Sequence, residues 1–100
     1  TMALIGKQVR HLRSLAHHLE PVVFIGKADV NEAVVTQANE ALEARELIKC
    51  SVQDGYLLSA RDAATDLASK TNAEVVQVIG HKFSLYRRSE KPGIEHIELP

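Results

Sequence analysis

The sequence predicts a single α/β domain in which helices cover a four-stranded mixed sheet. In three segments, apolar residues recur at three- and four-residue steps, which is typical of amphipathic helices. Short apolar or alternating runs lie between and after these segments, as expected of strands. The predicted order is helix, strand, helix, strand, helix, strand, strand, which gives two parallel crossovers followed by a hairpin. The pattern does not determine the order of the strands in the sheet.

The chain of 100 residues, 45% of them hydrophobic, is long enough for one core that buries roughly two thirds of the unfolded chain's surface. We expect a domain over residues 4–88 and a C-terminal tail over residues 89–100. No apolar stretch approaches the length of about 20 residues that crosses a bilayer, and no secretory signal is apparent. The expectation is a soluble, cytoplasmic monomer. The single cysteine, Cys50, is expected to be a buried thiol.

The first predicted helix covers residues 4–19 and ends before Pro21, because a residue that precedes proline is pushed out of the helical region. The first strand covers residues 22–25. Its four residues are all apolar, which predicts a strand in the interior of the sheet, buried on both faces.

The second predicted helix begins after a cap at Asp29 or Asn31 and runs to about residue 44. Residues 46–52 alternate as the second strand.

The third predicted helix covers residues 57–71 and is closed by Asn72, a residue type that tolerates the left-handed conformation. Residues 74–79 form the third strand. Gly80 opens a two-residue turn, so residues 82–87 should return antiparallel as the fourth strand.

The loop between the first strand and the second helix is a candidate phosphate site. Gly26 permits backbone angles that a side chain would forbid, the helix that follows begins with unpaired N–H groups, and Lys27 adds a positive charge. An ordinary strand-to-helix connection has the same composition. The spacing of a nucleotide-binding P-loop or of a G-x-G-x-x-G motif is not present.

Charge is unevenly distributed in a chain whose net charge is −1. Residues 31–76 hold eight acidic and four basic residues, whereas the basic residues Lys7, Arg10, Arg13 and Lys27 outnumber the acidic ones in residues 1–30. More basic residues follow residue 80. If the two ends of the chain meet in space, one side of the protein is basic, and a polyanion responds to such a local field.

The sequence contains no pattern of a catalytic or metal site. No serine or cysteine has the context of an activated nucleophile, and no pair of histidines has the i, i+4 spacing of a zinc helix. We therefore expect a binding module that is not an enzyme and uses no cofactor or metal.

Three segments in order resemble the CRM domain family, which comprises small bacterial RNA-binding proteins and plant organellar splicing factors and is named for chloroplast RNA splicing and ribosome maturation. The segments are VRHLRSLAHHLEPVVFIGK at residues 9–27, ALEARELIKC at residues 41–50 and VQVIGHKFSLYR at residues 76–87. The resemblance implies a fold like the C-terminal domain of bacterial translation initiation factor three. It also implies RNA binding without catalysis, with the RNA of the large-subunit precursor as partner during ribosome assembly.

The family's hallmark is a G-x-x-G loop, compared with the RNA-clamping loop of KH domains. Gly26, Lys27 and Ala28 match its first three positions, and Asp29 replaces the second glycine. A carboxylate there disfavours a phosphate at the loop, and Asp29 is equally suited to cap the helix.

The full set of candidate RNA-binding residues combines the basic side of the first helix, the loop and the fourth strand. These are Lys7, Arg10, His11, His17, His18, Gly26, Lys27, Ala28, Lys82, Arg87 and Arg88. The alternative is a protein-interaction module that docks on a ribosomal or assembly protein through its acidic middle segment.

Overall fold

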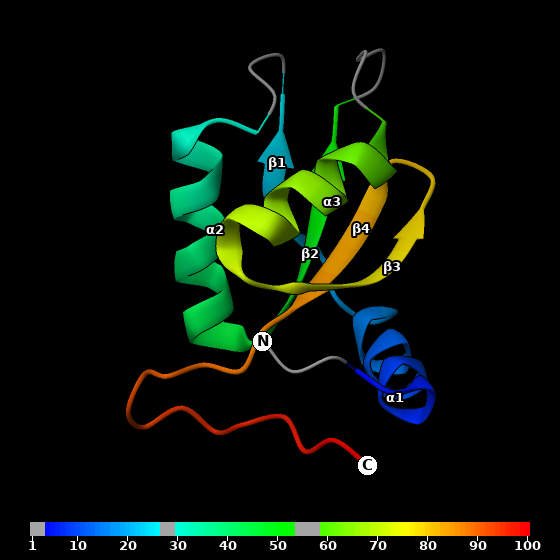
Figure 1. Ribbon diagram of the computed structural model, residues 1–100, viewed down its shortest axis with the longest axis vertical. Coiled ribbons are helices and arrows are strands. Elements are labelled where there is room, and N and C mark those ends of the chain that lie inside the picture. Colours follow the sequence, from blue (N-terminus) through cyan, green and yellow to red (C-terminus); the bar gives the residue numbers. More distant parts are fainter. Residues whose placement is uncertain (1–3, 27–29, 54–58) are drawn as a thin grey trace.

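The computed structural model describes residues 4–26, 30–53 and 59–100. Its elements follow the predicted order (Figure 1). They are α1 (Gly6–Ala16), β1 (Pro21–Ile25), α2 (Glu32–Arg45), β2 (Leu47–Val52), α3 (Ala60–Thr71), β3 (Glu74–Ile79) and β4 (Lys82–Tyr86). The predicted α/β class with a mixed four-stranded sheet is confirmed.

The strand order is β1-β2-β4-β3, with β1 parallel to β2 and β4 antiparallel to both of its neighbours. The prediction that the first strand lies inside the sheet is wrong, because β1 is an edge strand that pairs only with β2. Its residues alternate instead of being buried on both faces. Val23 and Ile25 are buried, whereas Phe24 is 64% exposed.

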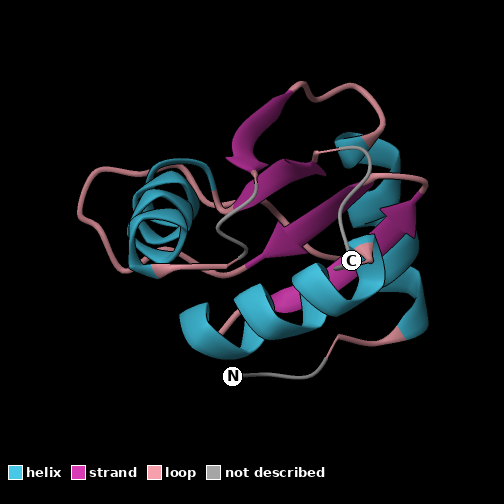
Figure 2. Cartoon of the chain, turned by 90° about the horizontal axis from the view of Figure 1, so that it is seen from above, coloured by secondary structure: helices cyan, strands magenta, loops and turns pink. Residues whose placement is uncertain are grey.

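Each face of the sheet carries its own hydrophobic cluster. On one face, α2 and α3 pack on strand residues that include Val23, Ile48 and Phe83. On the other face, Leu12 and Ala16 of α1 pack with one residue from each of three strands, and the C-terminal tail adds Ile97 and Leu99. Seen from above, α2 stands end-on beside the strands (Figure 2). The sheet is therefore the middle layer of three.

Local chemistry explains where the helices begin and end. The side chain of Asn31 accepts a hydrogen bond from the backbone N–H of Val34, so Asn31 is the cap of α2. The alternative cap, Asp29, lies outside the described residues. Ser59 caps α3 in the same way, and Asn72 ends that helix at φ 57°. Residues 57 and 58 of the predicted third helix lie outside the described residues, and Ser59 is the cap of α3 and not part of the helix.

The tail is held against the domain by one buried carboxylate. Glu46, between α2 and β2, has no exposed surface. It accepts hydrogen bonds from the backbone N–H groups of Ser89 and Ile97, both at 2.7 Å, and its Oε2 lies 2.6 Å from Nδ1 of His96. Burial by itself raises the pKa of Glu46, but these bonds and the charge of His96 outweigh it and lower the pKa below its ordinary value.

Candidate nucleic-acid interface

The two sides of α1 face different surroundings. The Gln8 side chain donates to the carbonyl of Pro100 in the tail at 3.3 Å, whereas Nε of Arg13 donates to the carbonyl of Val76 in β3 at 3.1 Å. Residues three and four apart are neighbours on a helix surface, so Arg10 and His17 lie on the same side as Arg13. We call Arg10, Arg13 and His17 the Arg13 flank. Arg13 reaches the sheet, whereas Arg10 and His17 are exposed beside it on the helix surface.

Part of the sheet beside this flank is not covered by α1. The register of the strands defines two rows of residues that point to this side. The outer row is Phe24, Ser51, Lys82 and Ile79, and the inner row is Pro21, Lys49, Ser84 and Gln77. We call these eight residues the open face; Ser84 lies within it but is buried, at 2% exposure. Val76, the contact of Arg13, directly precedes Gln77, so the Arg13 flank borders the inner row.

The open face and the Arg13 flank together carry only positive charge. Lys49 and Lys82 come from neighbouring strands, and they lie on the same side of the sheet, one row apart. None of the eight residues of the open face is acidic. Lys49 and Lys82 lie on the open face itself, Arg13 borders it, and Arg10 and His17 are exposed beside Arg13 on α1. Its geometry suits an extended anion.

The loop that begins at Gly26 leaves β1 at the end of the outer row. A Cβ atom built on Gly26 would lie 3.3 Å from Oε1 of Gln53, so a side chain there would require Gln53 to shift. Lys27, Ala28 and Asp29 lie outside the described residues. Their predicted roles stay predictions.

Arg87 is engaged inside the domain. Its guanidinium donates to Oδ1 of Asn39 at 2.7 Å and to the carbonyl of Thr71 at 2.6 Å, and it pairs with Glu43 at 3.2 Å. These contacts join α2, the end of α3 and the end of β4. The structure thus gives Arg87 a structural role that the sequence did not indicate.

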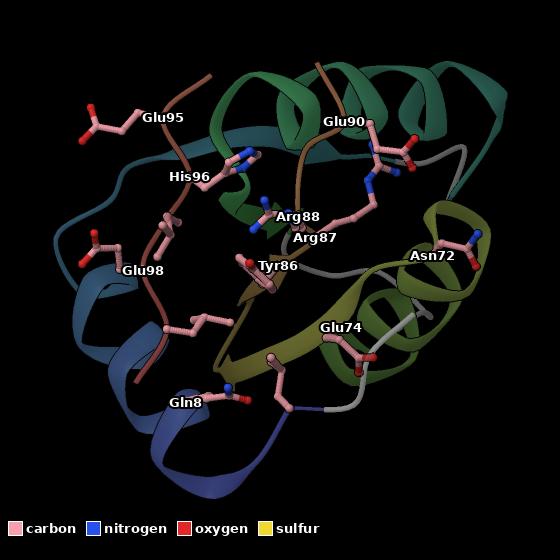
Figure 3. A pocket seen from close by; sticks show the side chains of 13 residues that line it. Gln8, Asn72, Glu74, Tyr86, Arg87, Arg88, Glu90, Glu95, His96 and Glu98 are labelled. Atoms are coloured by element: carbon pink, nitrogen blue, oxygen red, sulfur yellow. The ribbon is translucent and has the colours of Figure 1, made fainter. Parts of the chain in front are cut away.

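Arg88 lies away from the open face, in a cleft between β4, the start of β3 and the tail (Figure 3). The residues that line the cleft include four carboxylates, Glu74, Glu90, Glu95 and Glu98. These carboxylates oppose the approach of a phosphate. The structure therefore places Arg88 with Arg87 and not with the predicted cations of the open face.

The remaining predicted residues of the first helix divide between its sides. Arg10 and His17 belong to the Arg13 flank, Lys7 is the helix-surface neighbour of Arg10 three residues away, and His11 projects farther from Arg13. His18 follows the helix, and its ring meets that of His17 edge to face, with 5.6 Å between centroids. The sequence reasoning missed Arg13 and Lys49 as members of the site. The spacing of Arg10 and Arg13, three residues apart, was a usable signal for the first of them.

Comparison with known proteins identifies the family of this chain. The model of the CRS1/YhbY (CRM) domain matches residues 4–87. The chain belongs to the CRM domain family. The Bacillus subtilis protein named "Probable RNA-binding protein YqeI" is 45% identical to this CRM domain over 97% of the chain and 99% of the relative. A Haemophilus influenzae protein named "RNA-binding protein" is 38% identical over 92% of the chain and 93% of the relative.

A solved structure has the same fold as this CRM domain. The solution structure of the protein SAV1595 from Staphylococcus aureus matches with a TM-score of 0.81 and 43% identity, covering 98% of this chain and 100% of that one. At this identity the likeness extends to sequence as well as fold.

The described residues form neither a metal-binding group nor a helix that could cross a membrane. Within residues 4–26, 30–53 and 59–100, no three His, Cys, Asp or Glu side chains are grouped so that they could hold a metal ion. In the same part of the chain, no helix has the length and apolar character needed to span a bilayer.

Proposed function

We propose that this CRM domain is a non-catalytic RNA-binding protein and that it binds the ribosomal RNA of the large-subunit precursor during ribosome assembly. The observation that carries the RNA proposal is the group of basic side chains at the open face, with Lys49 and Lys82 on the strands and Arg13, beside Arg10 and His17, on the adjoining side of α1. Relatives with similar sequences are named RNA-binding proteins, which supports the choice of RNA over other polyanions. The ribosomal target rests on the family resemblance.

The distribution of charge over the surface matters more for RNA binding than the net charge of the chain. The chain as a whole carries −1, but its acidic residues are concentrated in the segment that forms α2 and α3, which pack on the opposite face of the sheet. At physiological ionic strength charges interact over about 8 Å, so a phosphate on the open face interacts with Lys49 and Lys82 more than with α2. Lys27, in the adjoining loop, is included as a further phosphate contact.

A charge-reversal pair tests the RNA interface. Each phosphate contact with single-stranded RNA contributes about 0.7 to the slope of log affinity against log salt, so two lost contacts weaken binding about 25-fold at 0.1 M salt. We therefore expect Arg10→Glu with Lys82→Glu to weaken binding to precursor large-subunit RNA by at least about 25-fold. The matched control is Arg61→Glu with Lys91→Glu, which makes the same change in net charge at exposed positions elsewhere.

Fluorescence anisotropy of labelled RNA fragments measures both pairs. Equal affinity of the two pairs would contradict an interface at the open face, because binding would then follow net charge alone.

A gradient experiment tests the ribosomal part of the proposal. The protein should co-sediment with immature large-subunit particles in a cell extract, and RNase digestion should release it. Association that survives digestion would instead support docking on a ribosomal or assembly protein.

A further inference from the structure

The outer row of the open face has an apolar side chain at each end. Phe24 is 64% exposed on the edge strand β1, and Ile79 is 63% exposed on the opposite edge strand β3. Between them lie Ser51 and Lys82, each paired in register with its neighbours across the sheet. Phe24 thus stands at one end of a row that crosses the entire sheet.

The exposure of Phe24 is not required by the fold. Its neighbours Val23 and Ile25 already supply β1's contribution to the core, and the Phe24 side chain points to the other face. An aromatic ring exposed on an edge strand favours unwanted association between sheets, so a polar residue would be the safer choice there. The presence of an exposed phenylalanine at position 24 is explained if its ring contacts a ligand.

The chemistry around Phe24 restricts what that ligand is. A partner must present a flat or apolar group to the ring and negative charge to Lys82 and Lys49, and none of the eight residues of the open face would attract a cation. A nucleotide has both properties in one unit, because its base offers a π-face and its phosphate a negative charge. An acidic peptide would present negative charge to the lysines, but it would not present a flat ring beside each charge.

We propose that Phe24 stacks on an unpaired nucleobase, so that the open face selects single-stranded RNA. This inference rests on the proposed RNA-binding function and adds to it the class of RNA. In a duplex each base is already stacked and paired, and the ring cannot reach its face. The phosphates beside the stacked base lie within reach of Lys49 and Lys82.

The size of the face agrees with a short single-stranded segment. Phe24 and Ile79 are separated by three strand spacings of about 4.8 Å, or roughly 14 Å. Four-stranded sheets of this width hold two or three bases in other RNA-binding domains. Ile79 provides an apolar contact for the base at the far side of the row.

Substitution of Phe24 tests the stacking contact. Base–aromatic stacking corresponds to a loss of roughly 5- to 150-fold in affinity when the ring is removed. We expect Phe24→Ala to weaken binding of a labelled oligouridine of about ten nucleotides by this factor. Binding of a duplex of the same length should change less than twofold. The matched control is Ile5→Ala, which removes another exposed apolar side chain, 52% exposed, at the N-cap of α1.

The absence of tryptophan from the sequence allows a direct spectroscopic readout. Phe24→Trp introduces a single tryptophan, which can still stack and whose emission can be excited apart from the two tyrosines. Its emission should be quenched to saturation by the single-stranded oligouridine, with affinity close to that of the wild type. A tryptophan placed by Ile5→Trp should keep its emission.

Each other outcome has a definite meaning. If wild type and Phe24→Ala bind the single strand equally, stacking is overturned while RNA binding stands. If the wild type binds duplex and single strand equally, selection of single strands is overturned. If the wild type binds no RNA, the proposed function fails as well. If sedimentation shows a wild-type dimer that Phe24→Ala dissociates, the face is an interface between two copies and the inference is wrong.

Discussion

Replacement of Glu46 by alanine should detach the C-terminal tail and destabilise the domain. The Glu46 carboxylate is buried and accepts from two backbone N–H groups and from His96. A hydrogen bond to a charged group contributes about 1.5 kcal/mol at the low end of its range, which gives about 4.5 kcal/mol for three. Tail residues that detach regain contact with water, so we expect a net loss of about 3 kcal/mol in the free energy of unfolding.

Urea denaturation followed by circular dichroism measures this loss. With a slope of about 1 kcal/mol per M urea for a small domain, the midpoint should fall by about 3 M. Glu40→Ala removes an exposed glutamate on α2, the helix that precedes Glu46; it is the control and should change the free energy of unfolding by less than about 0.5 kcal/mol.

The effect of Glu46→Ala should depend on pH in one direction. The pKa of Glu46 is lowered in the folded state, so between that pKa and the ordinary value of 4.5 the unfolded chain binds more protons than the folded one. The stabilisation is therefore complete above about pH 5 and is lost as pH falls through the folded pKa. The difference between wild type and Glu46→Ala should shrink on acidification. A difference below 0.5 kcal/mol at pH 7, or one that grows on acidification, would refute this reasoning.

Two further predictions concern other buried or engaged groups. Arg87→Lys keeps the charge but loses the hydrogen bonds to Asn39 and Thr71. Urea unfolding should therefore show a loss of about 2 kcal/mol in the free energy of unfolding, with RNA affinity nearly unchanged. The control, Arg88→Lys, should change neither the stability nor the RNA affinity. A large loss of RNA affinity in Arg87→Lys with normal stability would contradict its structural role. Burial raises the pKa of the Cys50 thiol to about 12, so a thiol reagent at pH 8 should label it only on unfolding. Rapid labelling of the native protein would contradict this burial.

Local sequence patterns predicted the elements of this fold, whereas long-range pairing determined how they are arranged. Helical periodicity and the residues Asn31, Asn72 and Gly80 carry their signals within a few positions, and the structure places each in its predicted role. Strand order depends on contacts between distant residues. The apolar run of β1 therefore suggested an interior strand, although the exposed Phe24 shows that an apolar residue can face outward.

The candidate site was only partly predictable for the same reason. A basic residue is equally visible in the sequence whether it faces solvent or pairs inside the domain, and the partners of Arg87 lie up to 48 positions away. Lys49 joins Lys82 only through the register of β2 and β4. The sequence could indicate that basic residues gather at the two ends of the chain, but not which of them share a surface.

The salt dependence of RNA affinity tests the central claim most directly. With about three to five phosphate contacts, log affinity of the wild type for single-stranded RNA should fall with log salt at a slope of roughly −2 to −3.5. Lys49→Gln with Lys82→Gln should make that slope shallower by about 1.4, because two contacts are removed from the open face. A slope that is the same in the variant and the wild type would contradict the claim that these strand lysines hold the RNA backbone.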